Sequence, residues 1–261
     1  MTALRIAWLG HSTVVIDLDG VRILTDPLLR PHAGLLRRIA PRPERAQWRD
    51  PDAVLISHLH HDHAELRSLR MLPEVPVMSA APNAAWLARR GLPAAVAIDE
   101  SWTGVGGGEV EVRLVDAVHR HRPMPHRPND AHGHLVRGPS ATLWVAGDTS
   151  LHPAMSALPE LAGGSLDVAL VPVWGWGPRL SEGHMTPAQA AVACARSGAR
   201  WAVPVHWGTL HPPLVARVAR GWLERPGEEF AEALARVAPG CEAVLLDPGE
   251  ARIIPVGGAA A

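Results

Sequence analysis

Lysine and tyrosine are absent from this sequence, and all 25 of its basic residues are arginine. The 26 acidic residues leave a net charge of −1. The chain therefore has neither the basic surplus of a nucleic-acid-binding polycation nor the charge excess of a disordered polyanion. Arginines act as anion clamps only where they converge, so we attribute their excess over lysine to mutational bias in the source genome. We expect no nucleic-acid partner.

Cysteine is scarce as well. Cys194 and Cys241 lie far apart in the sequence. A disulfide between them is one interpretation, but a reduced pair in the cytoplasm is favoured for a chain of this size. Cys194 lies within the apolar run 190–195, where we expect it to be a small core residue.

Long apolar runs are missing too. No stretch of about 18 uncharged apolar residues is present, which argues against a membrane-spanning helix. The N-terminus has no basic segment followed by a long apolar one, which predicts no signal peptide and a cytoplasmic location. Residues 27–51 are dense in proline and arginine, with interspersed leucines. Peripheral membrane contact through this segment stays open, although an ordinary solvated loop is favoured.

The hydrophobic pattern predicts strands and helices in both halves of a chain whose 261 residues can bury a large core. Residues 14–18 and 21–25, joined by Asp19-Gly20, predict a β-hairpin. Further strands are expected at 4–9, 53–57, 75–78, 96–98, 102–105, 109–118, 141–146, 168–173, 201–205, 243–246 and 252–254. Helices are expected at 64–72, 82–90, 187–197, 214–223 and 228–237. This order suits a two-sheet sandwich flanked by helices, with a doubly wound sheet as the alternative.

The most informative feature is the run His58-Leu59-His60-His61-Asp62-His63, which follows the predicted buried strand 53–57. Side chains two apart on an extended chain point to the same side, so His58 and His60 can reach one metal ion together. Asp62 and His63 follow once the chain has turned, and they can reach a second ion. A polar turn that merely collects histidines is the alternative, but the ordered pattern of imidazole and carboxylate ligands favours a metal site.

The segment 52–63 resembles the metallo-β-lactamase superfamily, and more narrowly the branch with N-acyl-phosphatidylethanolamine phospholipase D and the ascorbate-6-phosphate lactonases. Further matches occur in the order of that branch: Trp8-Leu9-Gly10-His11-Ser12-Thr13, Thr25-Asp26-Pro27, Ala117-Val118-His119, Gly147-Asp148-Thr149, Gly183-His184-Met185-Thr186-Pro187 and His206-Trp207-Gly208-Thr209. The resemblance implies the four-layer αββα fold of the superfamily, an α/β architecture forming one domain over residues 1–261.

Candidate ligands recur where predicted strands end, and sites in layered α/β folds form at such edges. Carried over from the family, one ion is held by His58, His60 and His119, the other by Asp62, His63 and His206, and both by Asp148. This set implies a dinuclear hydrolase in which a metal-bridging hydroxide is the nucleophile. Zinc is favoured, with manganese or iron as alternatives. Histidine at position 60 resembles the hydrolytic members rather than the oxygen-reducing diiron members, which tend to carry a carboxylate there.

Other residues admit two interpretations. Asp148 could be a turn residue or a helix N-cap. His121 lies two residues beyond His119 and could replace it as a ligand, although the Ala-x-His context favours His119. Asp26 either orients a ligand histidine through a hydrogen bond or belongs to a strand-end turn. His61 is out of phase with the motif and is expected to line the pocket or face solvent, and His11 to support the site structurally.

His184 precedes a predicted helix and follows a tryptophan-rich loop. In the family this histidine lies at the substrate, so we expect it to stabilise an oxyanion or to protonate the leaving group. Its alternative is a residue of the helix start, near a cap at Thr186. Asp62 and His184 are thus the predicted catalytic residues, and Trp174, Trp176 and His184 the predicted substrate contacts. The two tryptophans depart from the smaller residues associated with this branch.

The substrate is the least determined part of the function. A phosphodiester, lipid-like or nucleotide-like, is slightly favoured because two metal ions suit in-line displacement at phosphorus. A lactone of a small metabolite is the alternative, and a metal-holding protein without turnover is a third hypothesis. Ribonuclease relatives share the motif, but a chain without a basic surplus is poorly suited to RNA. Homo-oligomerisation stays open.

Overall fold

Strands form two large sheets in the computed structural model, which describes residues 4–119, 127–213 and 221–256. Across these residues the first sheet has the order β17-β1-β2-β3-β6-β7-β8 and the second the order β16-β14-β13-β12-β11-β10-β9. The strands of the first sheet are β1 Leu4–Gly10, β2 Thr13–Leu18, β3 Val21–Thr25, β6 Ala53–Leu55, β7 Val77–Ala80, β8 Ala95–Ile98 and β17 Ala251–Ile254. Those of the second are β9 Thr103–Val105, β10 Val110–Asp116, β11 His132–Arg137, β12 Thr142–Val145, β13 Val168–Pro172, β14 Trp201–Val205 and β16 Glu242–Ala243.

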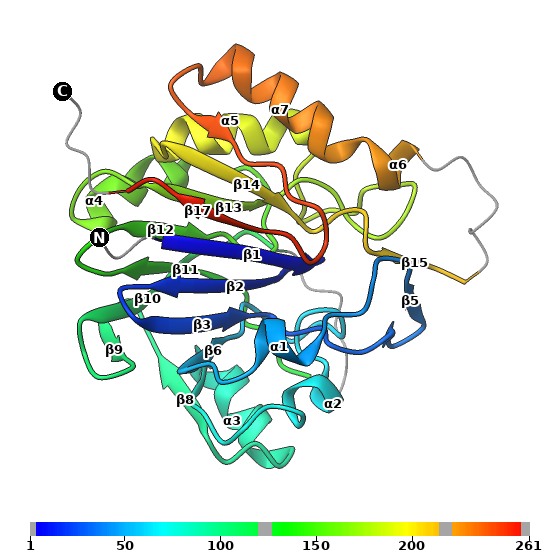
Figure 1. Ribbon diagram of the computed structural model, residues 1–261, viewed down its shortest axis with the longest axis vertical. Coiled ribbons are helices and arrows are strands. Elements are labelled where there is room, and N and C mark those ends of the chain that lie inside the picture. Colours follow the sequence, from blue (N-terminus) through cyan, green and yellow to red (C-terminus); the bar gives the residue numbers. More distant parts are fainter. Residues whose placement is uncertain (1–3, 120–126, 214–220, 257–261) are drawn as a thin grey trace.

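A third, three-stranded sheet joins β4 His32–Ala33, β5 Leu36–Arg38 and β15 Leu210–His211. The helices are α1 Arg45–Trp48, α2 Leu66–Leu69, α3 Ala81–Arg89, the 3₁₀ helix η1 Pro153–Ala157, α4 Leu158–Ala162, α5 Pro187–Ser197, α6 Gly221–Glu224 and α7 Pro226–Val237. In Figure 1, α5 and α7 cover one side of the molecule and α3 lies on the opposite side.

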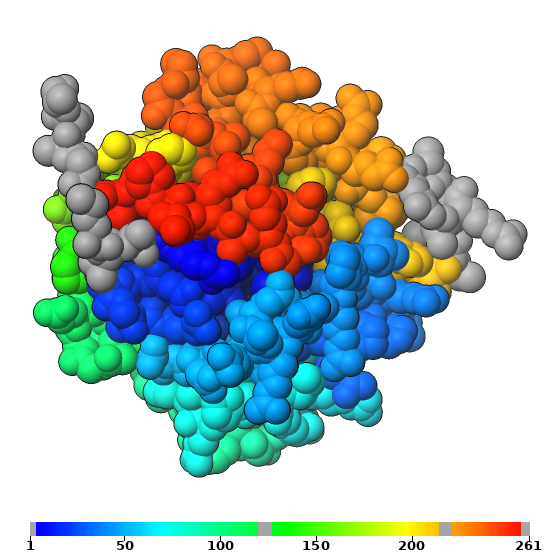
Figure 2. All heavy atoms as spheres, in the orientation of Figure 1, coloured from blue at the N-terminus to red at the C-terminus, as the bar shows by residue number. Residues whose placement is uncertain are grey.

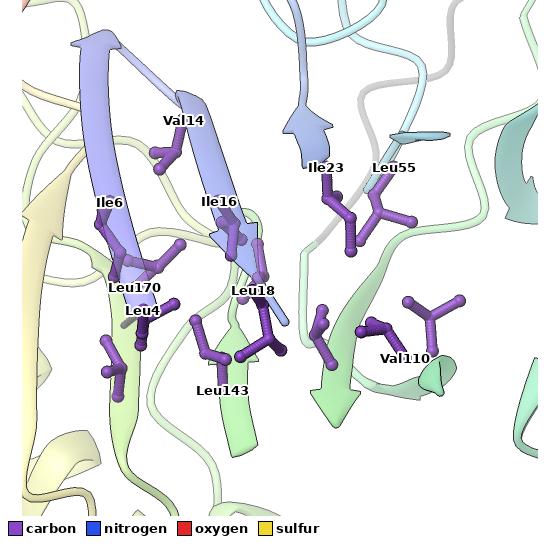
Figure 3. Packing of buried hydrophobic residues seen from close by; sticks show 14 of the residues in the cluster. Leu4, Ile6, Val14, Ile16, Leu18, Ile23, Leu55, Val110, Leu143 and Leu170 are labelled. Atoms are coloured by element: carbon purple, nitrogen blue, oxygen red, sulfur yellow. The ribbon is translucent and has the colours of Figure 1, made fainter. Parts of the chain in front are cut away.

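The two large sheets pack face to face over an apolar core. Figure 3 shows side chains of the first sheet, among them Ile6 and Ile16, turned toward Leu143 and Leu170 of the second. All four are almost completely buried. Each such side chain stabilises the fold by about 1.5–3 kcal/mol relative to an exposed one.

The outer faces of the sheets are covered as well. In β1, Ile6 and Trp8 belong to the core between the sheets, whereas Ala7 and Leu9 belong to the apolar cluster on the outer face, which extends to Trp86 and Leu87 of α3. The second sheet packs its outer face on α5 and α7. A strand that is buried on both faces shows no polar alternation, as β1 illustrates. The result is the predicted four-layer order of helix, sheet, sheet and helix.

The parallel strands place their carboxyl ends at a common edge. β3, β6, β7 and β8 run parallel in the first sheet, and β12, β13, β14 and β16 in the second. The end of the chain closes the first sheet, because β17 pairs with β1 in antiparallel register. Figure 2 shows this C-terminal segment in red beside the blue N-terminal strands.

Several elements differ from their predicted extent. The segment 27–51, expected to be irregular, contains β4, β5 and α1. The helix expected at 64–72 is only the four-residue α2, whose start is fixed by the Glu65 side chain, which accepts from the N–H groups of Arg67 and Ser68. β11 and the helices η1 and α4 were not predicted, and the strand expected at 243–246 is reduced to β16. Of the helix expected at 214–223, residues 214–220 lie outside the described residues, and α6 begins at Gly221.

Two further expectations concern the cysteines and membranes. Cys194 and Cys241 are not bonded to each other, and both lie buried in the core between the second sheet and its helices, where Cys194 is a small core residue as expected. In the described parts of the chain, no helix is long and apolar enough to cross a membrane.

His134 in β11 gives the fold a pH dependence. Its side chain is buried, and neither ring nitrogen has a hydrogen-bond partner among the described residues. Burial lowers the pKa of His134 to about 4, against an ordinary value of 6.5. Because the unfolded chain binds this proton more readily, the contribution of His134 is fully favourable above pH 6.5 and is lost as the pH falls toward 4.

Lowering the pH from 7 to 4 should therefore destabilise the wild type more than the variant His134→Leu. We expect the difference between their free energies of unfolding to change by about 3 kcal/mol in favour of the variant. Denaturant titrations of both proteins at a series of pH values measure this difference. The other histidines are present in both proteins, so their contributions to the pH dependence cancel in the difference. Parallel pH profiles for the two proteins would show that His134 is not held neutral.

Candidate metal centre

The candidate site lies where three parallel strands end. β6 leads through Ser57 to the run that begins at His58, β12 leads to Asp148, and β14 leads directly to His206. Since β6 belongs to the first sheet and the other two to the second, both sheets contribute side chains to one place. Gly147 has φ +61°, and a Cβ there would lie 2.7 Å from Cβ of Ser57. Glycine at this position therefore lets the Asp148 loop approach the end of β6.

One group consists of His58, His60, His119 and Asp148, whose candidate ligand atoms all lie within 4.8 Å of one another. Nδ1 of His60 lies 2.9 Å from Nε2 of His58 and 3.1 Å from Nε2 of His119. Oδ2 of Asp148 lies 3.7 Å from Nε2 of His58. His60 is partly buried and the other three are buried.

A second, adjoining group consists of His11, Asp62, His63 and His206, all of them buried. Nε2 of His206 lies 3.2 Å from Nε2 of His63 and 3.8 Å from Oδ2 of Asp62. Asp148 also reaches this group, because its Oδ2 lies 3.2 Å from Nε2 of His63 and its Oδ1 3.2 Å from Nε2 of His206. The Asp148 carboxylate therefore stands between the two groups.

Hydrogen bonds on the far side of the rings fix how three histidines face the centre. Nδ1 of His119 donates to the carbonyl oxygen of Gly183, and Nδ1 of His206 donates to that of Trp174. Nδ1 of His63 donates to the carboxylate of Asp26 at 2.8 Å. These oxygens can only accept, so in the neutral ring the lone pair is on Nε2 and points at the centre.

Asp26 organises the base of the site. Its Oδ1 accepts from the main-chain N–H of Ser57 at 2.8 Å, and its Oδ2 accepts from Oγ of Ser57 at 2.6 Å. Because the Ser57 hydroxyl proton is used in this way, its oxygen is free to accept from Nδ1 of His58 at 3.0 Å. Asp26 thus orients His63 directly and His58 through Ser57, which is the first of the two interpretations of its sequence position.

Burial and the carboxylates act in opposite directions on the histidines. Burial lowers the pKa of His58 well below its ordinary value and that of His60 to about 4. Burial has the same effect on His206, but the Asp148 carboxylate outweighs it and raises the pKa of His206 to about 9. For the Asp148 carboxyl, burial opposes ionisation, yet His206 and His63 hold its pKa well below the usual range. The centre therefore combines ionised carboxylates with imidazoles of two kinds: His58 and His60 resist protonation, whereas the Asp148 carboxylate favours it at His206.

Backbone strain accompanies the site. His11, Asp26 and His206 have φ values of +54°, +37° and +64°, which non-glycine residues rarely adopt. Each such residue costs about 1–3 kcal/mol and persists only where its surroundings hold it. Here His206 lies between the end of β14 and the centre, and its N–H donates to the carbonyl oxygen of His11.

The donor set fits divalent cations. Imidazole nitrogens of His58, His60, His63 and His206 converge on one another, and among the described side chains both oxygens of the buried Asp148 carboxylate face imidazole nitrogens alone. A buried carboxylate is costly unless cations or hydrogen-bond donors compensate its charge. Imidazole nitrogen and carboxylate oxygen are ligands that zinc, iron and manganese accept.

Residues 21–207 match the family model described as the beta-lactamase superfamily domain. The chain belongs to this superfamily. It is 30% identical to a UPF0173 metal-dependent hydrolase of Nitratidesulfovibrio vulgaris strain Hildenborough over 264 residues, which cover 94% of this chain and 93% of that one. It is 28% identical to a UPF0173 metal-dependent hydrolase of Methanopyrus kandleri over 252 residues, with coverage of 95% and 98%.

The fold agrees with this assignment. Igni18, a metallo hydrolase from Ignicoccus hospitalis, superimposes with a TM-score of 0.75 at 20% identity, covering 96% of this chain and 98% of that chain. The chain thus has the metallo-β-lactamase fold and is a metal-dependent hydrolase of this superfamily with histidine and aspartate groups suited to metal ions. The narrower branch with the phospholipase D and the lactonases stays a prediction.

The structure of this metal-dependent hydrolase brings all seven predicted ligands together, namely His58, His60, Asp62, His63, His119, Asp148 and His206. Their role as ligands stays a prediction. Asp148 caps no helix, since the next one begins at Pro153, and His121 lies outside the described residues. His11, expected to be a structural support, lies 2.9 Å from the Asp62 carboxylate through its Nε2. His61 is exposed, with its ring beside Gly34.

Of the predicted catalytic and substrate residues, Asp62 and His184 lie at the centre, and the carbonyl oxygen of Trp174 accepts from His206. Nε2 of His184 lies 3.1 Å from Oδ2 of Asp148. Thr186 caps α5 through the N–H of Gln189, so the predicted cap exists two residues beyond His184. Trp174 is half-buried, and Trp176 has 39% of its surface exposed.

The sequence analysis did not identify Arg127 and Asn129, which contact the loop that begins at His58. Arg127 contacts the main chain at Leu59 and Ala64, and Asn129 contacts Leu59 and lies near His60. The partners are separated by 63 to 70 positions. No local motif signals such a contact, because it depends on how distant loops meet.

The Asp26 network provides a testable prediction. In the variant Asp26→Asn the amide NH₂ faces either the Ser57 N–H at the Oδ1 position, or both the Ser57 hydroxyl and Nδ1 of His63 at the Oδ2 position. Loss of an outer partner of a ligand typically lowers metal affinity or activity by about 10–100-fold. We expect a decrease of this size in zinc affinity, measured by competition with a chromogenic chelator. Unchanged affinity would mean that the orientation of His63 does not depend on Asp26.

Proposed function

We propose that this chain is a dinuclear metal-dependent hydrolase that cleaves phosphodiesters. The observation that carries the proposal is the position of Asp148, whose two carboxylate oxygens face two adjoining groups of imidazoles. In this proposal one ion is held by His58, His60 and His119, the other by Asp62, His63 and His206, and Asp148 contributes to both. The nitrogen-rich donor set favours zinc, with manganese and iron as alternatives.

When bound, two divalent ions lower the pKa of a water molecule and polarise the scissile bond. The residues of the chain supply the rest of the chemistry. Asp62 and Asp148 remain ionised, because neighbouring histidines hold the pKa of both carboxyls well below the usual range despite their burial. Their negative charge balances that of the cations in a site that is closed to most solvent.

His184 is the proposed proton donor to the leaving group. Its Nε2 lies 3.1 Å from Asp148, and its Nδ1 lies near the hydroxyl and the carbonyl oxygen of Ser181. In the proposed tautomer Nδ1 accepts from the Ser181 hydroxyl, and the ring proton is then on Nε2, at the edge of the centre, where a departing oxygen would need it. Trp174 and Trp176 are proposed to contact the substrate, and their rings favour one with an apolar or aromatic group.

The proposed role of His184 predicts that its replacement lowers turnover without lowering the metal content. In His184→Ala, turnover should fall by about 10²–10⁴-fold, the usual contribution of a general acid, while the metal content stays full. Turnover under saturating substrate and metal content by atomic emission measure the two quantities. His32→Ala, an exposed histidine in β4, is the matched control. Loss of metal in His184→Ala, or unchanged turnover, would contradict the role as proton donor.

Lactone opening is the second candidate, because the same metal-bound water and polarised oxygen can open a cyclic ester. An activated aryl phosphodiester and a panel of small lactones, assayed on zinc-loaded protein with Asp148→Ala as the blank, test both. Phosphodiester cleavage that the blank lacks would support the proposal. Lactone opening alone would replace it with the second candidate, and full metal loading without either activity would favour a metal-holding protein.

A further inference from the structure

Arg127 joins the two ends of the ligand loop, which we define as residues 58–64. Its Nη1 donates to the carbonyl oxygen of Leu59 at 2.7 Å and lies 3.4 Å from that of Ala64. Inside the loop, the N–H groups of His63 and Ala64 both point to the carbonyl oxygen of His60. The guanidinium therefore closes a tight turn across its ends, with the proposed ligands between its two contacts.

Asn129 holds the first part of the same loop. Its Oδ1 accepts from the N–H of Leu59 at 2.6 Å, and its Nδ2 lies 3.4 Å from Nε2 of His60. Leu59 stands between His58 and His60 in the sequence. Because its N–H and its carbonyl oxygen are both occupied by side chains of residues 127–130, the main chain between these two histidines is fixed on two sides.

The segment 127–130, which we call the clamp segment, rests on α3. The guanidinium carbon of Arg127 lies 4.8 Å from the centre of the Trp86 ring. Nδ2 of Asn83 donates to the carbonyl oxygen of Asp130 at 2.6 Å, and the N–H of Asp130 donates back to Oδ1 of Asn83 at 3.2 Å. Trp86 and Asn83 are both buried residues of α3. The clamp segment therefore has a rigid base, and the ligand loop is held against it.

The burial of Arg127 is itself informative. Only 6% of its surface is exposed. Removing a guanidinium from water is costly, and here the carbonyl oxygens of the ligand loop and the Trp86 ring compensate the cost. A planar guanidinium can serve two carbonyl oxygens in a fixed geometry, which a lysine ammonium on a flexible stem does less well.

We propose that Arg127 and Asn129 are positioning residues of the metal centre, an inference that rests on the proposed function. Arg127 contacts both ends of the ligand loop, so it affects the His58 and His60 side as well as the Asp62 and His63 side. Asn129 contacts only the first side. Arg127 thus supports the affinity for both ions, whereas Asn129 supports that of the ion assigned to His58, His60 and His119.

Zinc titration of the metal-free full-length protein against a chromogenic chelator tests this assignment without any substrate. Loss of a group that orients ligands lowers metal affinity by about 10–100-fold. In Arg127→Met we expect this decrease in both binding steps, and in Asn129→Ala in one step only. Asn129→Asp keeps an acceptor for the Leu59 N–H and should recover most of the lost affinity, which a general defect in folding would not allow.

Arg90→Met is the matched control. The guanidinium carbon of Arg90 lies 5.1 Å from the centre of the same Trp86 ring, but its side chain is exposed. The zinc affinity of the Arg90→Met variant should equal that of the wild type. If Arg127→Met does not fold, Arg127→Lys takes its place, with an intermediate decrease expected. Wild-type affinity in the Arg127 and Asn129 variants, or equal weakening of both steps in Asn129→Ala, would overturn the inference. A wild type that binds no zinc would overturn the proposed function itself.

Discussion

Replacing Asp148 by asparagine should reduce hydrolysis by more than the about 10–100-fold caused by loss of a residue that merely orients a ligand. The variant should also bind fewer than two ions per chain. Asparagine keeps the volume of the side chain, but it removes the negative charge. It also presents an NH₂ group to one of two imidazole nitrogens that now lie 3.2 Å from the carboxylate oxygens, on His63 and His206. Only one ion could then retain an oxygen ligand from this side chain.

Metal content by atomic emission and turnover of an aryl phosphodiester measure both effects on the same preparation. Asp50→Asn is the matched control, because its side chain is 80% exposed and its φ of +55° suits asparagine as well as aspartate. If Asp148→Asn retained two ions and normal turnover, the Asp148 carboxylate would not be needed to bind both ions. The position of Asp148 would then no longer support the proposed function.

Removal of the metal ions should lower the melting temperature by about 10 °C or more. A ligand present at about 1,000 times its dissociation constant stabilises the folded state by about 4 kcal/mol, and 1 kcal/mol corresponds to about 2–4 °C in a chain of this size. The proposed ligands come from both sheets, with His58 following β6 and His206 following β14. The ions would therefore link the two sheets as well as support catalysis.

Thermal unfolding before and after dialysis against a chelator measures this shift, and added zinc should restore the original value. The Asp148→Asn variant should show a smaller shift than the wild type, because it binds less metal before chelation. An unchanged melting temperature after verified loss of metal would mean that the sheets hold the ligand geometry without the ions.

Local signals explain the parts of the structure that could be predicted. The hairpin of β2 and β3 turns at Asp19 and Gly20, whose φ values of +50° and +84° are those that such a dipeptide favours. α5 runs from Pro187 to Ser197 and ends at Gly198 in the left-handed conformation, as its capping residues indicate. The candidate ligands could be named because their motifs lie at predicted strand ends.

Features that depend on distant contacts could not be predicted. β11 carries His132, Gly133 and His134, a composition that does not suggest a strand, and it forms because β10 and β12 pair with it on either side. Likewise, nothing near His119 in the sequence indicates that Gly183 accepts its Nδ1 proton. These contacts arise only when the chain has folded, so their residues carry no periodicity or motif of their own.

The positive φ angles of His11, Asp26 and His206 have a consequence for protein engineering. Glycine would relieve about 1–3 kcal/mol of strain at each position, so a library selected for thermal resistance in the absence of metal would enrich glycine there. Asp26 and His206 are also the residues whose side chains face the centre or orient a histidine that does. Directed evolution of this chain would thus exchange its site for stability unless each round of selection also required activity.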